Sequence, residues 1–82
     1  MKTLRSRGHR VLLAVLAEAR QEAGLTQREL AARLKLPRSY VSKVETGERR
    51  IDPVECVAWA RACAIEPGEL FSRFVAAIGR KL

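Results

Sequence analysis

Polar and basic side chains between residues 38 and 46 have the chemistry needed to hydrogen-bond to the edges of bases. On a helical wheel, one side and its flanks carry Arg38, Ser39, Tyr40, Ser42, Lys43 and Thr46. Short hydroxyl side chains would let such a helix enter a major groove, where Arg38 and Lys43 could donate to guanine O6 and N7. A position near the helix N-terminus favours Arg38 and Ser39 as base readers. The alternative interpretation is an ordinary solvated face.

The positive charge of the chain is concentrated in its first 50 residues. The 82 residues hold 16 Lys plus Arg and 9 Asp plus Glu, a net charge of +7. Residues 1–50 carry 12 basic against 5 acidic side chains, whereas residues 51–82 carry 4 of each. Such asymmetry predicts an anionic partner, with nucleic acid favoured over a membrane surface. A solvated basic face without a partner is the alternative.

Composition argues against several other classes of function. A chain of 82 residues forms one domain, and 48% hydrophobic residues suffice for a core, so disorder is not expected. His9, the single histidine, has no carboxylate or thiol partner near it in sequence. Glycine-rich phosphate loops and metal-ligand clusters are also missing, so we expect no enzyme, cofactor or metal site. Cys56 and Cys63 lie seven residues apart, about 10.5 Å along a helix, which is too far for a disulfide.

The N-terminus imitates a secretory signal, because basic residues precede the apolar run at 11–17. Seven residues are the lower limit for such a run, and cleavage would delete the segment expected to cover the next two helices. We therefore expect a cytoplasmic protein. No run of 18 apolar residues could span a membrane. A helix at 1–20 lying on a membrane surface is disfavoured, since it lacks a sharp polar and apolar division.

Capping signals predict five helices and no strand, which is an all-α fold. The first helix covers about residues 9–23 and stops at Gly24. Capping boxes at Thr26 and Asp52 open the second and fourth helices. Pro37 and Pro67 begin the third and fifth helices, which end near residues 47 and 79. Only residues 35–36 separate the second and third helices, so a sharp turn joins them, as in a helix-turn-helix.

Two stretches of this region resemble a known family. Residues 25–31, LTQRELA, are similar to the LTQ-x-ELA signature of the Cro/C1-type (XRE) helix-turn-helix family of DNA-binding transcriptional regulators. Residues 41–50, VSKVETGERR, resemble the motif that follows it in that family. The resemblance covers about residues 11–72. It implies a compact five-helix, lambda-repressor-like DNA-binding domain over 1–82, with a basic arm at 1–8, the helix-turn-helix at 26–47 and a recognition helix at 38–46.

The resemblance also implies roles for individual residues. It places Arg38, Ser39 and Lys43 at base-reading positions, with Tyr40 and Ser42 beside them. Contacts to phosphate fall on Gln27, Thr46, Arg49 and Arg50. A structural ion pair is implied for Arg20 and Glu45, and the inward position of Glu45 independently requires a basic partner. Lys35 stands where the family usually has Gly, and Pro37 replaces a usual Ser or Thr cap.

Residues 53–79 are expected to form a homodimer interface. The fourth helix is apolar almost all round, and the fifth carries two apolar stripes, of which one serves the core. We expect Phe71, Val75 and Ile78 to meet a second copy across a two-fold axis on a palindromic operator. Trp59 could belong to the core or to this interface. The alternative function is an antitoxin that covers a toxin with these helices and regulates its own promoter.

Overall fold

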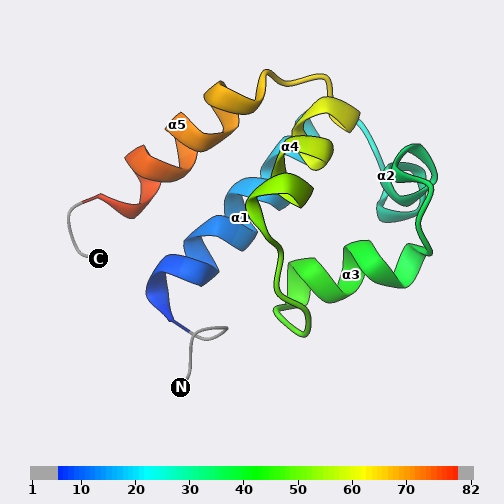
Figure 1. The fold of residues 1–82 in the computed structure, drawn as a ribbon, viewed down its shortest axis with the longest axis horizontal. Coiled ribbons are helices and arrows are strands. Elements are labelled where there is room, and N and C mark those ends of the chain that lie inside the picture. The colour runs from blue at the N-terminus through cyan, green and yellow to red at the C-terminus, as the bar shows by residue number, and fades with distance from the viewer. Residues whose placement is uncertain (1–5, 80–82) are drawn as a thin grey trace.

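The computed structural model describes residues 6–79 and arranges them as five helices with no strand among them (Figure 1). The helices are α1 (Arg7–Glu22), α2 (Gln27–Leu34), α3 (Arg38–Thr46), α4 (Pro53–Ala62) and α5 (Pro67–Ile78). This architecture confirms the all-α fold class expected from the sequence.

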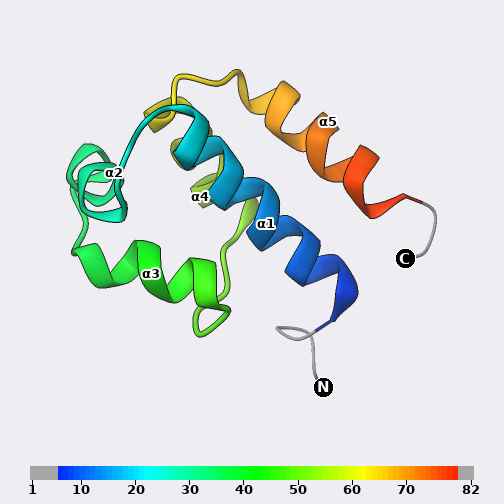
Figure 2. The same ribbon diagram turned by 180° about the vertical axis from the view of Figure 1, so that it is seen from behind.

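Helix α1 is the central element of the fold. It packs against α3, α4 and α5, and α2 packs against α3 and α4. Two views from opposite sides show α3 and α5 on opposite sides of α1 (Figures 1 and 2). The short helices α2 and α3 pack together at one end of the molecule. Because α5 lies on the other side of α1, it does not cover α3.

Side-chain caps set the starts of α2 and α4. Thr26 Oγ1 accepts a hydrogen bond from the Glu29 N–H at 3.0 Å, and the Thr26 N–H donates to Glu29 Oε1 at 2.9 Å. Asp52 and Glu55 make the same reciprocal pair, at 2.7 and 2.9 Å, with Pro53 in the first turn. Both expected capping boxes are thus formed.

The turn between α2 and α3 contains a left-handed residue other than glycine. Lys35 has φ 59° and ψ 41°, a conformation that costs a side chain with a Cβ about 1 kcal/mol. Pro37 is the N-cap of α3 and makes no side-chain hydrogen bond there, and the helix begins at Arg38. This corrects the expected start by one residue, because Pro37 has an extended backbone with ψ 149°.

Helix α1 begins inside the stretch expected to form the basic N-terminal arm, residues 1–8. Ser6 Oγ accepts a hydrogen bond from the His9 N–H at 3.1 Å, and this cap starts α1 at Arg7. Residues 7 and 8 are therefore helical, and residues 1–5 lie outside the described part of the chain.

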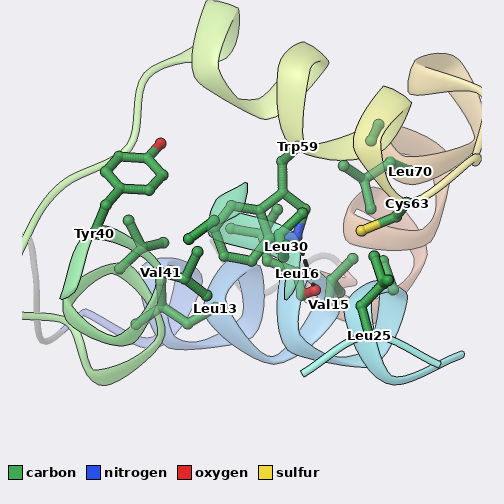
Figure 3. Close-up of a cluster of buried hydrophobic side chains, with 14 residues drawn as sticks. Leu13, Val15, Leu16, Leu25, Leu30, Tyr40, Val41, Trp59, Cys63 and Leu70 are labelled. Atoms are coloured by element: carbon green, nitrogen blue, oxygen red, sulfur yellow. Dashed lines mark hydrogen bonds between the residues drawn. The ribbon is translucent and has the colours of Figure 1, made fainter. Parts of the chain in front are cut away.

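Trp59 lies at the centre of the core. Its side chain is fully buried, and its Nε1–H donates to the Leu16 carbonyl oxygen at 3.0 Å (Figure 3). Trp59 is thus a core residue rather than an interface residue. Cys63 is buried beside it and Cys56 is half-buried, both as free thiols, and burial raises the pKa of each.

Helix α5 divides its apolar residues between the core and the surface. Leu70 and Ile78 are buried, whereas Phe71 is 64% and Val75 is 49% exposed. The Ile78 carbonyl oxygen also accepts a hydrogen bond from Arg7 Nη1 at 2.9 Å. Ile78 therefore packs within the protomer, which corrects its expected place in the dimer interface. The helical wheel missed this because it cannot show that the end of α5 rests on α1.

Candidate nucleic-acid interface

Helix α3 turns an apolar face inward and a polar face to solvent. Val41 and Val44 are fully buried in the core. The opposite face carries the exposed side chains of Arg38, Ser39, Lys43 and Thr46 together with the half-buried Ser42. Ser42 Oγ and Thr46 Oγ1 each donate to the carbonyl oxygen three residues earlier, at 3.3 Å. These bonds hold both hydroxyls against the helix backbone, so the longer side chains of Arg38 and Lys43 project beyond them.

Tyr40 lies in the core rather than beside the exposed face of α3. Only 9% of the residue is exposed, and its ring centroid is 6.4 Å from that of Trp59. In Figure 3 it stands at the edge of the buried cluster, with its hydroxyl directed away from Val41. This burial corrects the expectation that Tyr40 flanks the base-reading side chains. Burial, followed by the charge of Glu55, raises the pKa of Tyr40 to about 12.

A hydrogen-bond network around Glu45 fixes α3 to α1 and α2. Arg20 donates from Nε to Glu45 Oε2 at 2.7 Å and from Nη2 to Oε1 at 3.1 Å. Its Nη1 donates to the Leu25 carbonyl oxygen at 2.8 Å. Gln27 Nε2 donates to Glu45 Oε1 at 2.9 Å. The side chains of Arg20 and Glu45 are 13% and 9% exposed, so the ion pair implied by the sequence is nearly buried.

Gln27 stands where this network reaches the surface. Its bond to Glu45 uses one of the two N–H groups of the amide, and the other remains as a donor. An open depression beside it is lined by Arg20, Thr26, Gln27, Arg28 and Arg38. Arg28 is exposed in this depression and adds a basic residue to those expected from the sequence. Its charge and its place next to Gln27 in the LTQ-x-ELA stretch were the signals available for finding it.

The loop after α3 holds two arginines in different settings. Arg49 pairs with Glu55, Nη2 to Oε2 at 2.8 Å, and its Cζ lies 4.7 Å from the centroid of the Tyr40 ring. Arg50 is exposed, and its charge adds to burial in lowering the pKa of His9. The structure thus places Arg50 at the surface near the start of α1, and directs the guanidinium of Arg49 toward α4.

Neither a metal-binding cluster nor a membrane-spanning helix is found in the described residues. Within residues 6–79 no group of His, Cys, Asp and Glu is arranged to hold a metal ion. None of the helices in this range is both long and apolar enough to cross a membrane.

The chain is similar to known helix-turn-helix proteins. The sequence profile of the helix-turn-helix family matches residues 16–70, which is more than half of the chain. An XRE-family like protein from Pseudomonas syringae pv. tomato str. DC3000 shares 45% sequence identity over 92% of each chain, with a TM-score of 0.82. No curated protein matches the sequence.

Two more distant solved structures share the fold. The restriction-modification controller protein C.Esp1396I has a TM-score of 0.83 at 23% identity, over 90% of this chain and 97% of its own. That protein also has a structure as a tetramer in complex with its natural 35 base-pair operator. The clp gene regulator ClgR from C. glutamicum has a TM-score of 0.79 at 19% identity, over 94% of this chain and 100% of its own. With the family profile and the relative of 45% identity, the chain belongs to the Cro/C1-type (XRE) family of helix-turn-helix DNA-binding transcriptional regulators.

Proposed function

We propose that this protein is a repressor-like regulator that binds a palindromic operator as a homodimer and reads its sequence with α3. The observation that carries the proposal is the outer face of α3, which is exposed, polar and basic and is fixed by the nearly buried Arg20–Glu45 pair. A rigid helix of this kind can enter the major groove without first being ordered. Binding beside or over a promoter would then change transcription, in the cytoplasm where the operator lies.

The residue roles divide between bases and phosphates. Arg38, Ser39 and Lys43 lie on the exposed face of α3, where they can donate to base edges. Gln27 lies beside Arg38 at the depression next to that face, and Arg50 is exposed in the loop after α3, so both can contact phosphates. Thr46 can do so when its hydroxyl turns away from the Lys43 carbonyl oxygen. Arg28 adds a positive charge in the depression beside Gln27. Phosphate contacts set the register of the helix, and the base contacts then select the sequence.

Selection of bound duplexes from random DNA tests this proposal directly. We expect the selected duplexes to share two half-sites of opposite orientation, with centres about one helical turn apart, ~34 Å. Affinity for the selected duplex should fall steeply with salt, because several phosphates are neutralised. Recovery of no common sequence would contradict the sequence-specific part of the proposal.

The homodimer would form through exposed apolar residues of α4 and α5. Phe71 and Val75 on α5 and Val54 on α4 are exposed, with Val54 at 77%. An apolar groove of about 460 Å³ lies beside them and is lined by residues including Leu12, Cys56, Val57, Phe71 and Phe74. Burial of these side chains against a second copy would remove apolar surface from water. The four basic and four acidic side chains of residues 51–82 balance, so like charge does not oppose the contact.

Sedimentation of the parent and of Phe71→Asp tests the dimer. We expect a dimer for the parent at micromolar concentration, a monomer for Phe71→Asp, and weaker binding of the variant to the selected duplex. Ser72→Asp adds the same charge to an exposed neighbour and should leave the dimer intact. A monomeric parent, with Phe71→Asp binding DNA normally, would refute the dimer. Co-purification with a second small protein would instead support the alternative antitoxin function.

A further inference from the structure

The guanidinium of Arg49 joins three parts of the structure. Its Nη1 and Nη2 donate to Glu55 Oε1 and Oε2 at 3.2 and 2.8 Å, which ties it to the first turn of α4. Nη1 also donates to the carbonyl oxygen of Arg50. The guanidinium lies over the ring of Tyr40, which belongs to α3. Three of its five N–H donors are thus used within the protein.

These contacts leave Arg49 poorly suited to bind phosphate. The carboxylate of Glu55 lies 2.8 Å from Nη2 and cancels the charge of the guanidinium. A phosphate brought to the same nitrogen atoms would be repelled by this carboxylate. Glu55 is itself held in place, since its Oε1 also accepts the Asp52 N–H at 2.9 Å. The pair therefore behaves as a neutral structural unit.

The position of Arg50 depends on this unit. Arg50 follows Arg49 directly, and its carbonyl oxygen is one of the groups that Arg49 holds. The backbone N–H of Arg49 donates to the Lys43 carbonyl oxygen at 3.1 Å, which fixes the other end of the loop on α3. The loop at 47–52 is thereby bound to α3 on one side and to α4 on the other.

We propose that Arg49 is a positioning residue for DNA binding, which holds the 47–52 loop so that Arg50 meets a phosphate while α3 lies in the groove. The inference rests on the proposed function and changes the role that the family resemblance implied for Arg49. It separates the two neighbouring arginines: Arg50 supplies charge to the duplex, and Arg49 supplies geometry through Tyr40 and Glu55.

Arg49→Lys and Arg49→Gln distinguish the two roles. Lysine keeps the charge but has no planar fork for Glu55 and stacks less well on Tyr40. A positioning role predicts that both variants weaken binding of the selected duplex, by about threefold each. It also predicts that neither changes the slope of log K against log salt, because no phosphate contact is lost. For comparison, Arg50→Gln should make that negative slope shallower by about 0.9, the value for one phosphate contact.

Glu55→Gln is expected to change DNA binding in opposite directions under the two roles of Arg49. If Arg49 only positions the loop, Glu55→Gln should weaken DNA binding, and the double variant Arg49→Lys/Glu55→Gln should be no weaker than either single variant. If Arg49 bound phosphate, removal of the carboxylate would free it, and Glu55→Gln would bind more tightly with a steeper salt slope.

Fluorescence anisotropy of the duplex selected by the parent, measured over a salt series, provides both readouts. Thermal melting of each variant checks that it is folded. Three results would overturn the positioning role of Arg49. They are a slope that is shallower by about 0.9 for Arg49→Gln, binding by Arg49→Lys equal to that of the parent, and tighter binding by Glu55→Gln than by the parent. A parent that binds no duplex would instead refute the proposed function and this inference with it. If the parent binds the selected duplex normally and one of these three results is found, the role of Arg49 is refuted but the proposed function is not.

Discussion

Replacement of Arg20 by alanine would remove one partner of the nearly buried ion pair between α1 and α3. The change deletes two hydrogen bonds to Glu45 and a third to the Leu25 carbonyl oxygen. Among the described side chains that donate to Glu45, Gln27 Nε2 alone would remain. The Glu45 side chain is 9% exposed, so water could replace the lost donors only in part.

The cost follows from this burial. Loss of one partner of a fully buried ion pair destabilises a protein by about 3–5 kcal/mol. The remaining bond from Gln27 and the small exposure of both side chains place Arg20→Ala at the lower end, about 3 kcal/mol. For a domain of this size, that corresponds to a fall in melting temperature on the order of 15 °C.

Thermal and urea unfolding, followed by circular dichroism, measure this change. Arg73→Ala is the matched control, because Arg73 also donates to two carboxylates, Glu22 and Glu69, at 2.8 and 2.9 Å. The Arg73 pair lies at the surface, where water and salt screen the charges, so its loss should change the melting temperature far less. A melting temperature of Arg20→Ala equal to that of the parent, or to that of Arg73→Ala, would refute the reasoning.

Two further predictions concern stability. Lys35→Gly should stabilise the fold by about 0.5 kcal/mol, since relief of the left-handed strain exceeds the added freedom of the unfolded chain; Ala32→Gly, within α2, should instead destabilise it by about 0.5–1 kcal/mol in the same urea titration. The pKa of Tyr40 is raised to about 12 from its ordinary value of 10.0, so the unfolded state loses this proton first and stability should fall between these pH values. Tyr40→Phe should lose less stability than the parent over that range, and identical pH profiles would contradict the assignment.

Local rules predicted most of the helix boundaries. The capping boxes at Thr26 and Asp52 act within four residues, so the pattern of residue types is enough to find them. The Arg20–Glu45 pair also follows from sequence, because an inward carboxylate on α3 needs a cation and the family resemblance names one. These features depend on spacing along one helix or on a single strong electrostatic requirement.

The predictions that the structure corrects concern residues whose neighbours come from distant parts of the chain. Tyr40 sits on a flank of its helical wheel, and only the packing of α3 against Trp59 of α4 shows that it is buried. Ile78 shares an apolar stripe with Phe71 and Val75, and the contact of α5 with α1 decides which of them is covered. Arg49 looks like a free cation until the chain turns and brings Glu55 beside it. Periodicity gives the face of a helix but not what that face meets.

On the proposed function, the outer face of α3 selects the base sequence. This selection is tested by the affinities of the parent, Arg38→Ala and Arg50→Ala for the selected duplex and for a duplex of mixed sequence. Loss of a bidentate base contact should cost Arg38→Ala about 1–3 kcal/mol on the selected duplex and much less on mixed DNA, whereas Arg50→Ala should weaken both alike. If Arg38→Ala weakens both duplexes equally, α3 does not read bases through Arg38, and the account of this interface is contradicted.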